Sequence, residues 1–155
     1  AKALRNFKGL PHRVEKIETI DGVTYYDDSK GTNVGSTVAA LGGFVQPVVL
    51  IAGGDGKGQD FEPLIEPLSR HARAVVLMGR DAPLLEKVLG QTRLTMVHAK
   101  DMNQAVMLAS QQAQAGDAVL LSPACASLDM YAHYVARAEA FVQAVQHMGL
   151  LEGQP

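Results

Sequence analysis

The chain turns at Asp27-Asp28-Ser29-Lys30-Gly31-Thr32-Asn33, between a strand-like segment and a helix-like one. β-Branched and aromatic residues at 23–26 precede the turn, and Val34, Val38 and Leu41 follow it at helical spacing. A helix that starts directly after a strand leaves unpaired backbone N–H groups at the positive end of its dipole, where an anion binds well. The turn also carries a carboxylate, an ammonium group and hydroxyl groups. We therefore expect it to hold a ligand.

The simpler alternative is a turn without a ligand. In that case Asp28 and Lys30 would point into water, and Thr32 or Asn33 would only cap the following helix. Both interpretations stay open from this stretch alone, because capping by itself accounts for a threonine or an asparagine at a helix start.

Composition narrows the class of protein. The chain has 155 residues, 47% of them hydrophobic, and a formal net charge of −2, which fits one domain with a sizeable core. Such a charge gives no reason to expect nucleic acid, and apolar runs such as 48–52 are too short to span a membrane. Cys125 is the only cysteine, which suits a reducing cytoplasm. Because the chain starts with Ala1 rather than Met, we expect a piece of a longer protein.

Strand-like and helix-like segments alternate along the chain. Asp21-Gly22 between residues 13–20 and 23–26 predicts a β-hairpin, although Val14, Ile17 and Ile20 do not alternate cleanly. We predict four further strands from apolar runs at 47–52, 74–78, 94–97 and 118–121. The helices between them are predicted to start at the N-caps Asp60, Asp81 and Asp101, with a helix shortened or kinked by Pro67 and a last helix that ends at Gly149.

This alternation predicts an α/β fold, a Rossmann-like three-layer sandwich whose sheet is mostly parallel with an antiparallel N-terminal hairpin strand. Ligands of such sheets bind beyond the carboxyl ends of the strands. The loops 28–33, 53–60 and 122–129 each follow a strand and precede a helix, so we expect them to converge. Lys57 in the second loop offers a positive charge to a carboxylate or phosphate, unless it is simply solvated, and Ser127 in the third can cap a helix or bind an anion. Cys125 is predicted to be a buried packing residue.

Two phosphate-binding motifs are excluded. A P-loop needs glycine six residues before its lysine and Ser or Thr after it, but Ile51 and Gly58 stand at those places around Lys57. The dinucleotide fingerprint fails because Gly54, Gly56 and Gly58 are spaced by two. The five histidines show no metal-ligand spacing, so we predict no metal site.

Three segments taken together resemble the Mur ligases: residues 9–15, 28–33 and 121–129. The resemblance runs from about Leu4 to Met148 and covers only the third, C-terminal domain of those enzymes. It implies that residues 1–11 are an interdomain linker and that 12–155 form the amino-acid-binding domain. The UDP-binding and central ATPase domains would be absent from this chain.

The resemblance also implies an activity. Mur ligases form amide bonds in cytoplasmic peptidoglycan synthesis, and ATP converts the acceptor carboxylate to an acyl phosphate. The members with the most similar motifs add D-glutamate to UDP-N-acetylmuramoyl-L-alanine. The third domain closes over the central one, which would bind most of the ATP and Mg²⁺, so we expect the isolated domain to be inactive.

Site residues follow from the same resemblance. Arg13 would lie against the nucleotide, Asp28 would bind the ribose hydroxyls, and the catalytic Lys30 would reach toward the ATP phosphates. The residues that would hold D-glutamate are Thr32, Lys57, Ser127, Leu128 (through its backbone) and Tyr134. The last helix departs from the usual family pattern at His133, Tyr134, Val135 and Ala138.

Two alternatives remain. The chain could be a stand-alone Rossmann-like module for a nucleotide or another anion, which tight nucleotide binding by the isolated chain would favour. It could also be the C-terminal domain of another Mur or folylpolyglutamate-type ligase, although the segment 122–129 matches those less well.

Overall fold

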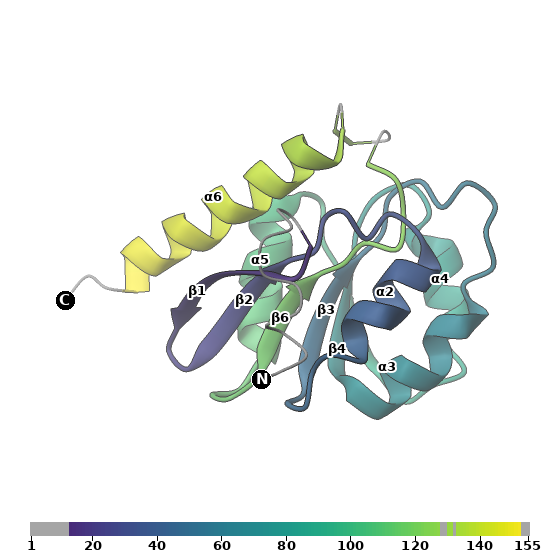
Figure 1. The fold of residues 1–155 in the computed structure, drawn as a ribbon, viewed down its shortest axis with the longest axis horizontal. Coiled ribbons are helices and arrows are strands. Elements are labelled where there is room, and N and C mark those ends of the chain that lie inside the picture. Colours follow the sequence, from purple (N-terminus) through teal and green to yellow (C-terminus); the bar gives the residue numbers. More distant parts are fainter. Residues whose placement is uncertain (1–12, 128–129, 132, 153–155) are drawn as a thin grey trace.

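A six-stranded sheet lies between two layers of helices (Figure 1). The computed structural model describes residues 13–127, 130–131 and 133–152, so the predicted linker at 1–11 lies outside the described residues. The strands follow one another across the sheet in the order β1 (Glu15–Ile20), β2 (Val23–Asp27), β6 (Ala118–Leu121), β3 (Val48–Ala52), β4 (Ala72–Leu77) and β5 (Thr95–His98). β1 is antiparallel to β2, and the other neighbours are parallel. The predicted sandwich is confirmed.

The helices divide between the two faces of this sheet. One face is covered by α2 (Val34–Leu41), the 3₁₀ turn η1 (Glu62–Leu64), α3 (Ile65–His71) and α4 (Ala82–Leu89). The other face is covered by α5 (Met102–Gln112) and α6 (Tyr134–Glu152), which lie together in Figure 1. None of the helices in the described part of the chain combines the length and the apolar character that crossing a membrane requires.

Alternate residues of the central strands pack into two separate hydrophobic cores, one on each face of the sheet. In β3, Leu50 packs with the α2–α4 layer, whereas Ile51 packs with α5 and α6. Both side chains are fully buried, and each such burial contributes about 1.5–3 kcal/mol. This two-sided burial explains why the strands are evenly apolar in sequence.

The hairpin is irregular, as its sequence suggested. The register between β1 and β2 shifts between Lys16 and Glu18, which marks a β-bulge or similar irregularity. An extra residue in one strand breaks the alternation of faces. That is why Val14, Ile17 and Ile20 do not follow a period of two.

Two of the predicted helix caps are confirmed. The side chain of Asn33 accepts a hydrogen bond from the N–H of Ser36 at 2.9 Å and starts α2. Asp101 accepts one from the N–H of Gln104 at 2.8 Å and starts α5. Both residues are in extended backbone conformation, as an N-cap usually is.

Of the other two predicted caps, Asp60 is wrong and Asp81 is right in position only. Asp60 accepts the N–H of Glu62 at 3.0 Å, but the residue at the cap position of η1 is Phe61. Asp81 stands at the N-cap position of α4 without a capping bond, because its carboxylate accepts the N–H of Gly56 instead. The Asp81 carboxylate therefore accepts an N–H from another loop instead of an N–H at the start of α4.

The proline and glycine expectations have opposite outcomes. Pro67 lies in the first turn of the seven-residue α3, where a missing N–H costs little, so the predicted shortening is confirmed. Gly149 does not end the last helix, because α6 continues to Glu152. A Cβ at Gly149 would collide with the Glu18 carboxylate and lie 3.2 Å from Cδ1 of Ile20. This glycine lets α6 lie close to β1.

Candidate functional site

The three predicted loops leave the carboxyl ends of three neighbouring strands. These strands are β2, β6 and β3, in that order across the sheet. The chain passes to the α2–α4 face after β2 and β3, but to the α5–α6 face after β6. Neighbouring strands whose connections leave on opposite faces form the crevice in which ligands of such sheets bind. We call this edge of the sheet the rim.

Backbone hydrogen bonds tie the loops together. The N–H of Ala124 in the β6–α6 loop donates to Gly31 O in the β2–α2 loop at 2.9 Å. Asp55 in the glycine-rich β3–η1 loop exchanges two bonds with Ala126, at 2.9 and 2.8 Å. The expected convergence is thus confirmed for the described residues.

Gln59 adds a side-chain link that the sequence did not reveal. Its Oε1 accepts the N–H of Val34 at 3.0 Å, and its Nε2 donates to Ala124 O at 2.7 Å. One amide therefore joins the glycine-rich loop to the start of α2 and to the β6–α6 loop. A glutamine in a polar loop gives no sign of this, because such side chains are usually exposed.

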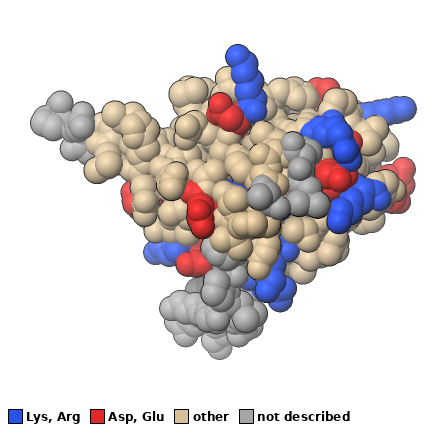
Figure 2. Space-filling view, turned by 90° about the horizontal axis from the view of Figure 1, so that it is seen from above, with Lys and Arg blue, Asp and Glu red and all other residues tan. Residues whose placement is uncertain are grey.

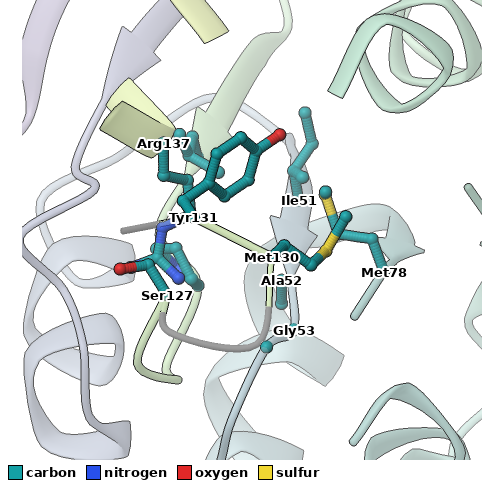
Figure 3. A pocket seen from close by; sticks show the side chains of 11 residues that line it. Ile51, Ala52, Gly53, Met78, Ser127, Met130, Tyr131 and Arg137 are labelled. Carbon is teal, nitrogen blue, oxygen red and sulfur yellow. The ribbon is translucent and has the colours of Figure 1, made fainter. Parts of the chain in front are cut away.

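Arg137 of α6 is a second link that sequence reasoning missed. It is only 3% exposed, and it donates to Cys125 O and to Ser29 O, both at 3.0 Å. Cys125 is fully buried in the core, as predicted. Arg137 also lines a hollow of ≈ 10 Å³ with Ser127 and Tyr131 (Figure 3). That volume holds about one water molecule, so the hollow is too small for an amino acid.

The three residues predicted for the nucleotide lie together. Arg13, Asp28 and Lys30 line one open hollow of ≈ 160 Å³, with Gly31 and Ser36 among its other walls. Arg13 and Lys30 are exposed, whereas Asp28 is 3% exposed. The hollow thus presents two cationic side chains to solvent beside a buried carboxylate.

Asp28 is held by two hydrogen bonds. Its Oδ1 accepts the N–H of Val14 at 3.2 Å, and its Oδ2 accepts Ser122 Oγ at 2.6 Å. Ser122 Oγ lies 2.9 Å from Thr37 Oγ1, whose hydroxyl lies 3.2 Å from Ser122 O. A buried polar chain therefore runs from α2 through the β6–α6 loop to Asp28.

Burial raises the pKa of Asp28 to about 6. The bonds from Ser122 and Val14 lower that pKa, the neighbouring charge of Asp27 raises it, and the charge of Arg13 lowers it. The alternative in which Asp28 is solvated is therefore wrong. The same alternative was right that Asn33 caps α2 and that Lys30 is exposed.

Gly31 leaves the space that this arrangement needs. A Cβ there would lie 2.6 Å from Ser122 Oγ and 2.7 Å from Asp28 Oδ2. We expect Gly31→Ala to force the two groups apart and to lower the free energy of unfolding by about 1–3 kcal/mol. Thermal or urea unfolding of the chain measures this change.

Gly35→Ala is the matched control for that substitution. Gly35 lies in α2, and its Cβ would meet nothing closer than 3.5 Å. Alanine is the better helix former, so this variant should gain about 0.5–1 kcal/mol. Equal stability of the two variants would show that the Asp28–Ser122 contact is not tightly packed.

The described residues among those predicted for the amino acid lie in the loops of the rim and at the start of α6. Thr32 is half-buried and follows Gly31, Ser127 is buried beside Ala126, and Tyr134 is the first residue of α6. Leu128 lies outside the described residues. The individual binding roles of these residues stay predictions.

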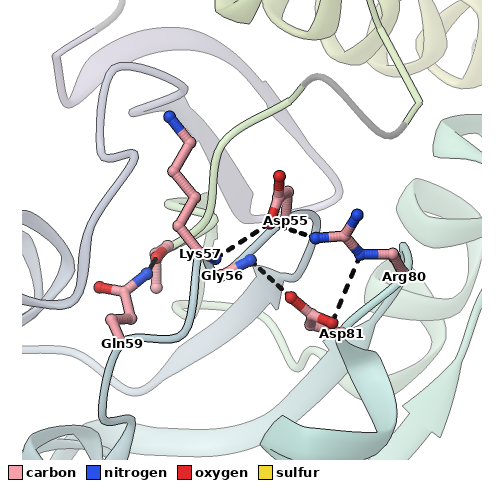
Figure 4. Close-up of polar contacts among 7 residues, drawn as sticks. Asp55, Gly56, Lys57, Gln59, Arg80 and Asp81 are labelled. Atoms are coloured by element: carbon pink, nitrogen blue, oxygen red, sulfur yellow. Dashed lines mark hydrogen bonds and ion pairs between the residues drawn. The ribbon is translucent and has the colours of Figure 1, made fainter.

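Lys57 has an unusual backbone. Its φ of 51° is in the left-handed region, which costs a non-glycine residue about 1–2 kcal/mol. Its N–H donates to Asp55 Oδ1 at 3.0 Å, while its exposed side chain extends away from the loop (Figure 4). Within the described part of the chain, no carboxylate is paired with its ammonium group.

A fourth loop, between β4 and α4, contributes two residues that sequence reasoning did not single out as part of the site. The Arg80 guanidinium contacts the Asp55 carboxylate, and its Nε lies 3.6 Å from Asp81 Oδ1 (Figure 4). Asp81 Oδ2 in turn accepts the N–H of Gly56 at 2.7 Å. Arg80 and Asp81 therefore anchor the glycine-rich loop to the β4–α4 loop.

Seen from the rim end, basic and acidic side chains lie next to one another rather than in a patch of one sign (Figure 2). The described residues include no group of three or more His, Cys, Asp or Glu side chains placed to hold a metal ion. The charges available to a ligand here are therefore those of individual side chains.

Fold and rim together define a Rossmann-like α/β domain with the rim at a switch point of its sheet, the place where ligands of such folds bind. The profile of the family "Mur ligase, glutamate ligase domain" matches residues 12–125, and the chain belongs to this family. The predicted resemblance is confirmed.

Two curated relatives carry the same name. The chain is 64% identical over 143 residues to the UDP-N-acetylmuramoylalanine–D-glutamate ligase of Aromatoleum aromaticum, covering 92% of this chain and 31% of the relative. It is 59% identical over 147 residues to that of Nitrosospira multiformis, covering 95% and 31%. The chain therefore spans about a third of the length of these relatives.

A solved structure shares the fold at much lower identity. The murein peptide ligase of Psychrobacter arcticus superimposes with a TM-score of 0.65 at 12% identity, covering 96% of this chain and 31% of that one. This similarity supports the fold alone.

Proposed function

We propose that this chain is the amino-acid-binding domain of an ATP-dependent ligase that adds D-glutamate to UDP-N-acetylmuramoyl-L-alanine in the cytoplasm. The identity of 64% and 59% to relatives named as D-glutamate ligases, along nearly the whole chain, carries the proposal.

D-Glutamate brings two carboxylates and an amine to the rim. The Lys57 ammonium would pair with one carboxylate, and the Ser127 and Thr32 hydroxyls would donate to the other carboxylate. The backbone N–H of Leu128 would add one donor, and Tyr134 would lie beside the ligand. The unpaired charge of Lys57 within the described residues supports this assignment.

The hollow lined by Arg13, Asp28 and Lys30 suits the phosphates and the ribose of a nucleotide. A guanidinium and an ammonium group suit phosphates, and a carboxylate suits the ribose hydroxyls. Bound ATP would supply the phosphoryl group that activates the acceptor carboxylate. Lys30 would orient its phosphates, and Mg²⁺ would be held by the rest of the ligase, since the described residues offer no cluster of ligands for it.

A direct assay can compare the activity of the isolated domain with that of the full-length ligase. We expect the 155-residue chain alone to show no ATP-dependent ligation and only weak nucleotide binding, because its nucleotide hollow is open. The full-length protein should incorporate D-glutamate and reject L-glutamate. Turnover by the isolated chain would contradict the proposal. Nucleotide binding with a dissociation constant below about 1 μM, near −8 kcal/mol, would instead favour a stand-alone binding module.

A further inference from the structure

We propose that Asp55 is the positioning residue of Lys57: its carboxylate holds the Lys57 backbone in the left-handed conformation and so directs the ammonium group toward the acidic amino acid. This inference rests on the proposed function, because it concerns how that site is built.

The local geometry supports a turn held by Asp55. An aspartate that accepts the N–H of the residue two positions later closes an Asx turn, and Asp55 does this with Lys57 at 3.0 Å. Figure 4 shows that the carboxylate contacts the backbone of Lys57 and not its ammonium group. Asp55 therefore fixes the direction of the side chain without neutralising its charge.

The Asp55 carboxylate is itself restrained. Its side chain is 19% exposed, and the Arg80 guanidinium contacts the same Oδ1 that accepts the Lys57 N–H. Asp81 holds the intervening Gly56 N–H at 2.7 Å. The turn is thus held by contacts from the β4–α4 loop in addition to its own hydrogen bond between Lys57 and Asp55.

The backbone of Asp55 reaches the other side of the site. Its two hydrogen bonds to Ala126 place it next to Ser127, which the proposed function assigns to the same ligand. These backbone bonds connect the turn that carries Lys57 to the residue before Ser127. A ligand with two carboxylates depends on the spacing between Lys57 and Ser127.

The loop would not keep this shape without the turn. Gly53, Gly54 and Gly58 allow many backbone conformations, and a left-handed lysine is disfavoured unless something holds it. Loss of the Asp55 carboxylate should let Lys57 relax. D-Glutamate binding then weakens, while ATP binding on the β2–α2 side is unaffected.

A double-mutant cycle in the full-length ligase tests this coupling. We expect Asp55→Ala to raise the KM for D-glutamate about 5- to 20-fold with little change in kcat or in the KM for ATP. In the Lys57→Ala background the same substitution should change that KM less than about twofold, because the group it positions is gone.

Asp60→Ala is the matched control, since Asp60 lies in the same loop and accepts the Glu62 N–H at the same 3.0 Å. It should leave the KM for D-glutamate unchanged. Asp55→Asn keeps an oxygen that can accept the Lys57 N–H, so it should restore most of the affinity. Unfolding curves of each variant check that the domain remains folded.

Three outcomes would overturn the inference: no change with Asp55→Ala, the same change in both backgrounds, or Asp55→Asn as impaired as Asp55→Ala. The assignment of Lys57 within the proposed function fails separately, if Lys57→Ala alone leaves the KM for D-glutamate unchanged. In that case Lys57 does not bind the amino acid, and there is nothing for Asp55 to position.

Discussion

Lys57→Ala should raise the KM for D-glutamate of the full-length ligase about 10- to 100-fold, because a hydrogen bond to a charged group is worth about 1.5–3 kcal/mol. The side chain is exposed, extends from the loop, and has no carboxylate partner among the described residues. The interaction is present in both the bound and the reacting complex. Steady-state kinetics should therefore show a raised KM with kcat nearly unchanged.

Two further variants separate charge from general damage. Lys57→Met keeps the length of the side chain without its charge and should behave like alanine. Lys87→Ala removes an exposed lysine of α4, on an element that lies outside the proposed site, and should leave the kinetics as they were. An unchanged KM for D-glutamate in Lys57→Ala, or an equal rise in the KM for ATP, would remove Lys57 from the amino-acid site.

The sheet and the three loops were predictable because their causes are local and periodic. A strand buried on both faces must be evenly apolar, as Val48–Ala52 is. Parallel strands joined by helices bring the loops that follow them to one edge. The rim therefore followed from the order of the segments, before any contact was known.

The helix caps show that the local sequence does not decide which N–H group an aspartate side chain accepts. Asp81 and Asp101 look alike in sequence, each standing just before a helical pattern. Asp101 caps α5, whereas Asp81 turns to the N–H of Gly56, which another loop presents to it. The choice depends on a competing donor 25 residues away. No pattern around Asp81 contains that information.

The residues that hold the site together were missed for the same reason. Arg137 donates to Ser29 O across 108 residues of chain, and Gln59 donates to Ala124 O across 65. Each is a polar residue of a type that is usually exposed. Their burial and their partners are set by tertiary packing, which periodicity and motif spacing do not reveal.

Asp28→Asn should stabilise the domain at pH 8 while impairing the ligase. The pKa of Asp28 in the folded protein is raised to about 6 from 3.8 because the carboxylate is buried. A raised pKa favours the protonated form of the folded state, so this stabilisation is complete below about pH 3.8 and is lost as pH rises through about 6. At pH 8 the ionised group costs on the order of 2–3 kcal/mol that asparagine would not.

Asparagine can keep the local hydrogen bonds. Its amide oxygen would accept the Val14 N–H, and its amide nitrogen would donate to Ser122 Oγ. Ser122 would then donate to Thr37 Oγ1, which keeps its own bond to Ser122 O. The substitution thus removes the charge with little loss of contacts. In the full-length ligase we expect the KM for ATP to rise about tenfold or more, since charge-assisted bonds to the ribose are lost.

Asp117→Asn is a control of opposite sign. Burial alone would raise the pKa of Asp117, but the hydrogen bond from Arg73, the N–H of Gln114 and the charge of Arg73 together lower it. A lowered pKa contributes stability that is present above the unfolded value and lost as pH falls through the folded one, so this variant should be less stable at pH 8. Urea unfolding at pH 4 and pH 8 compares the two. The stability gain of Asp28→Asn should appear at pH 8 and largely vanish at pH 4. A gain of equal size at both pH values would show that packing, and not the buried charge, sets the stability at this position.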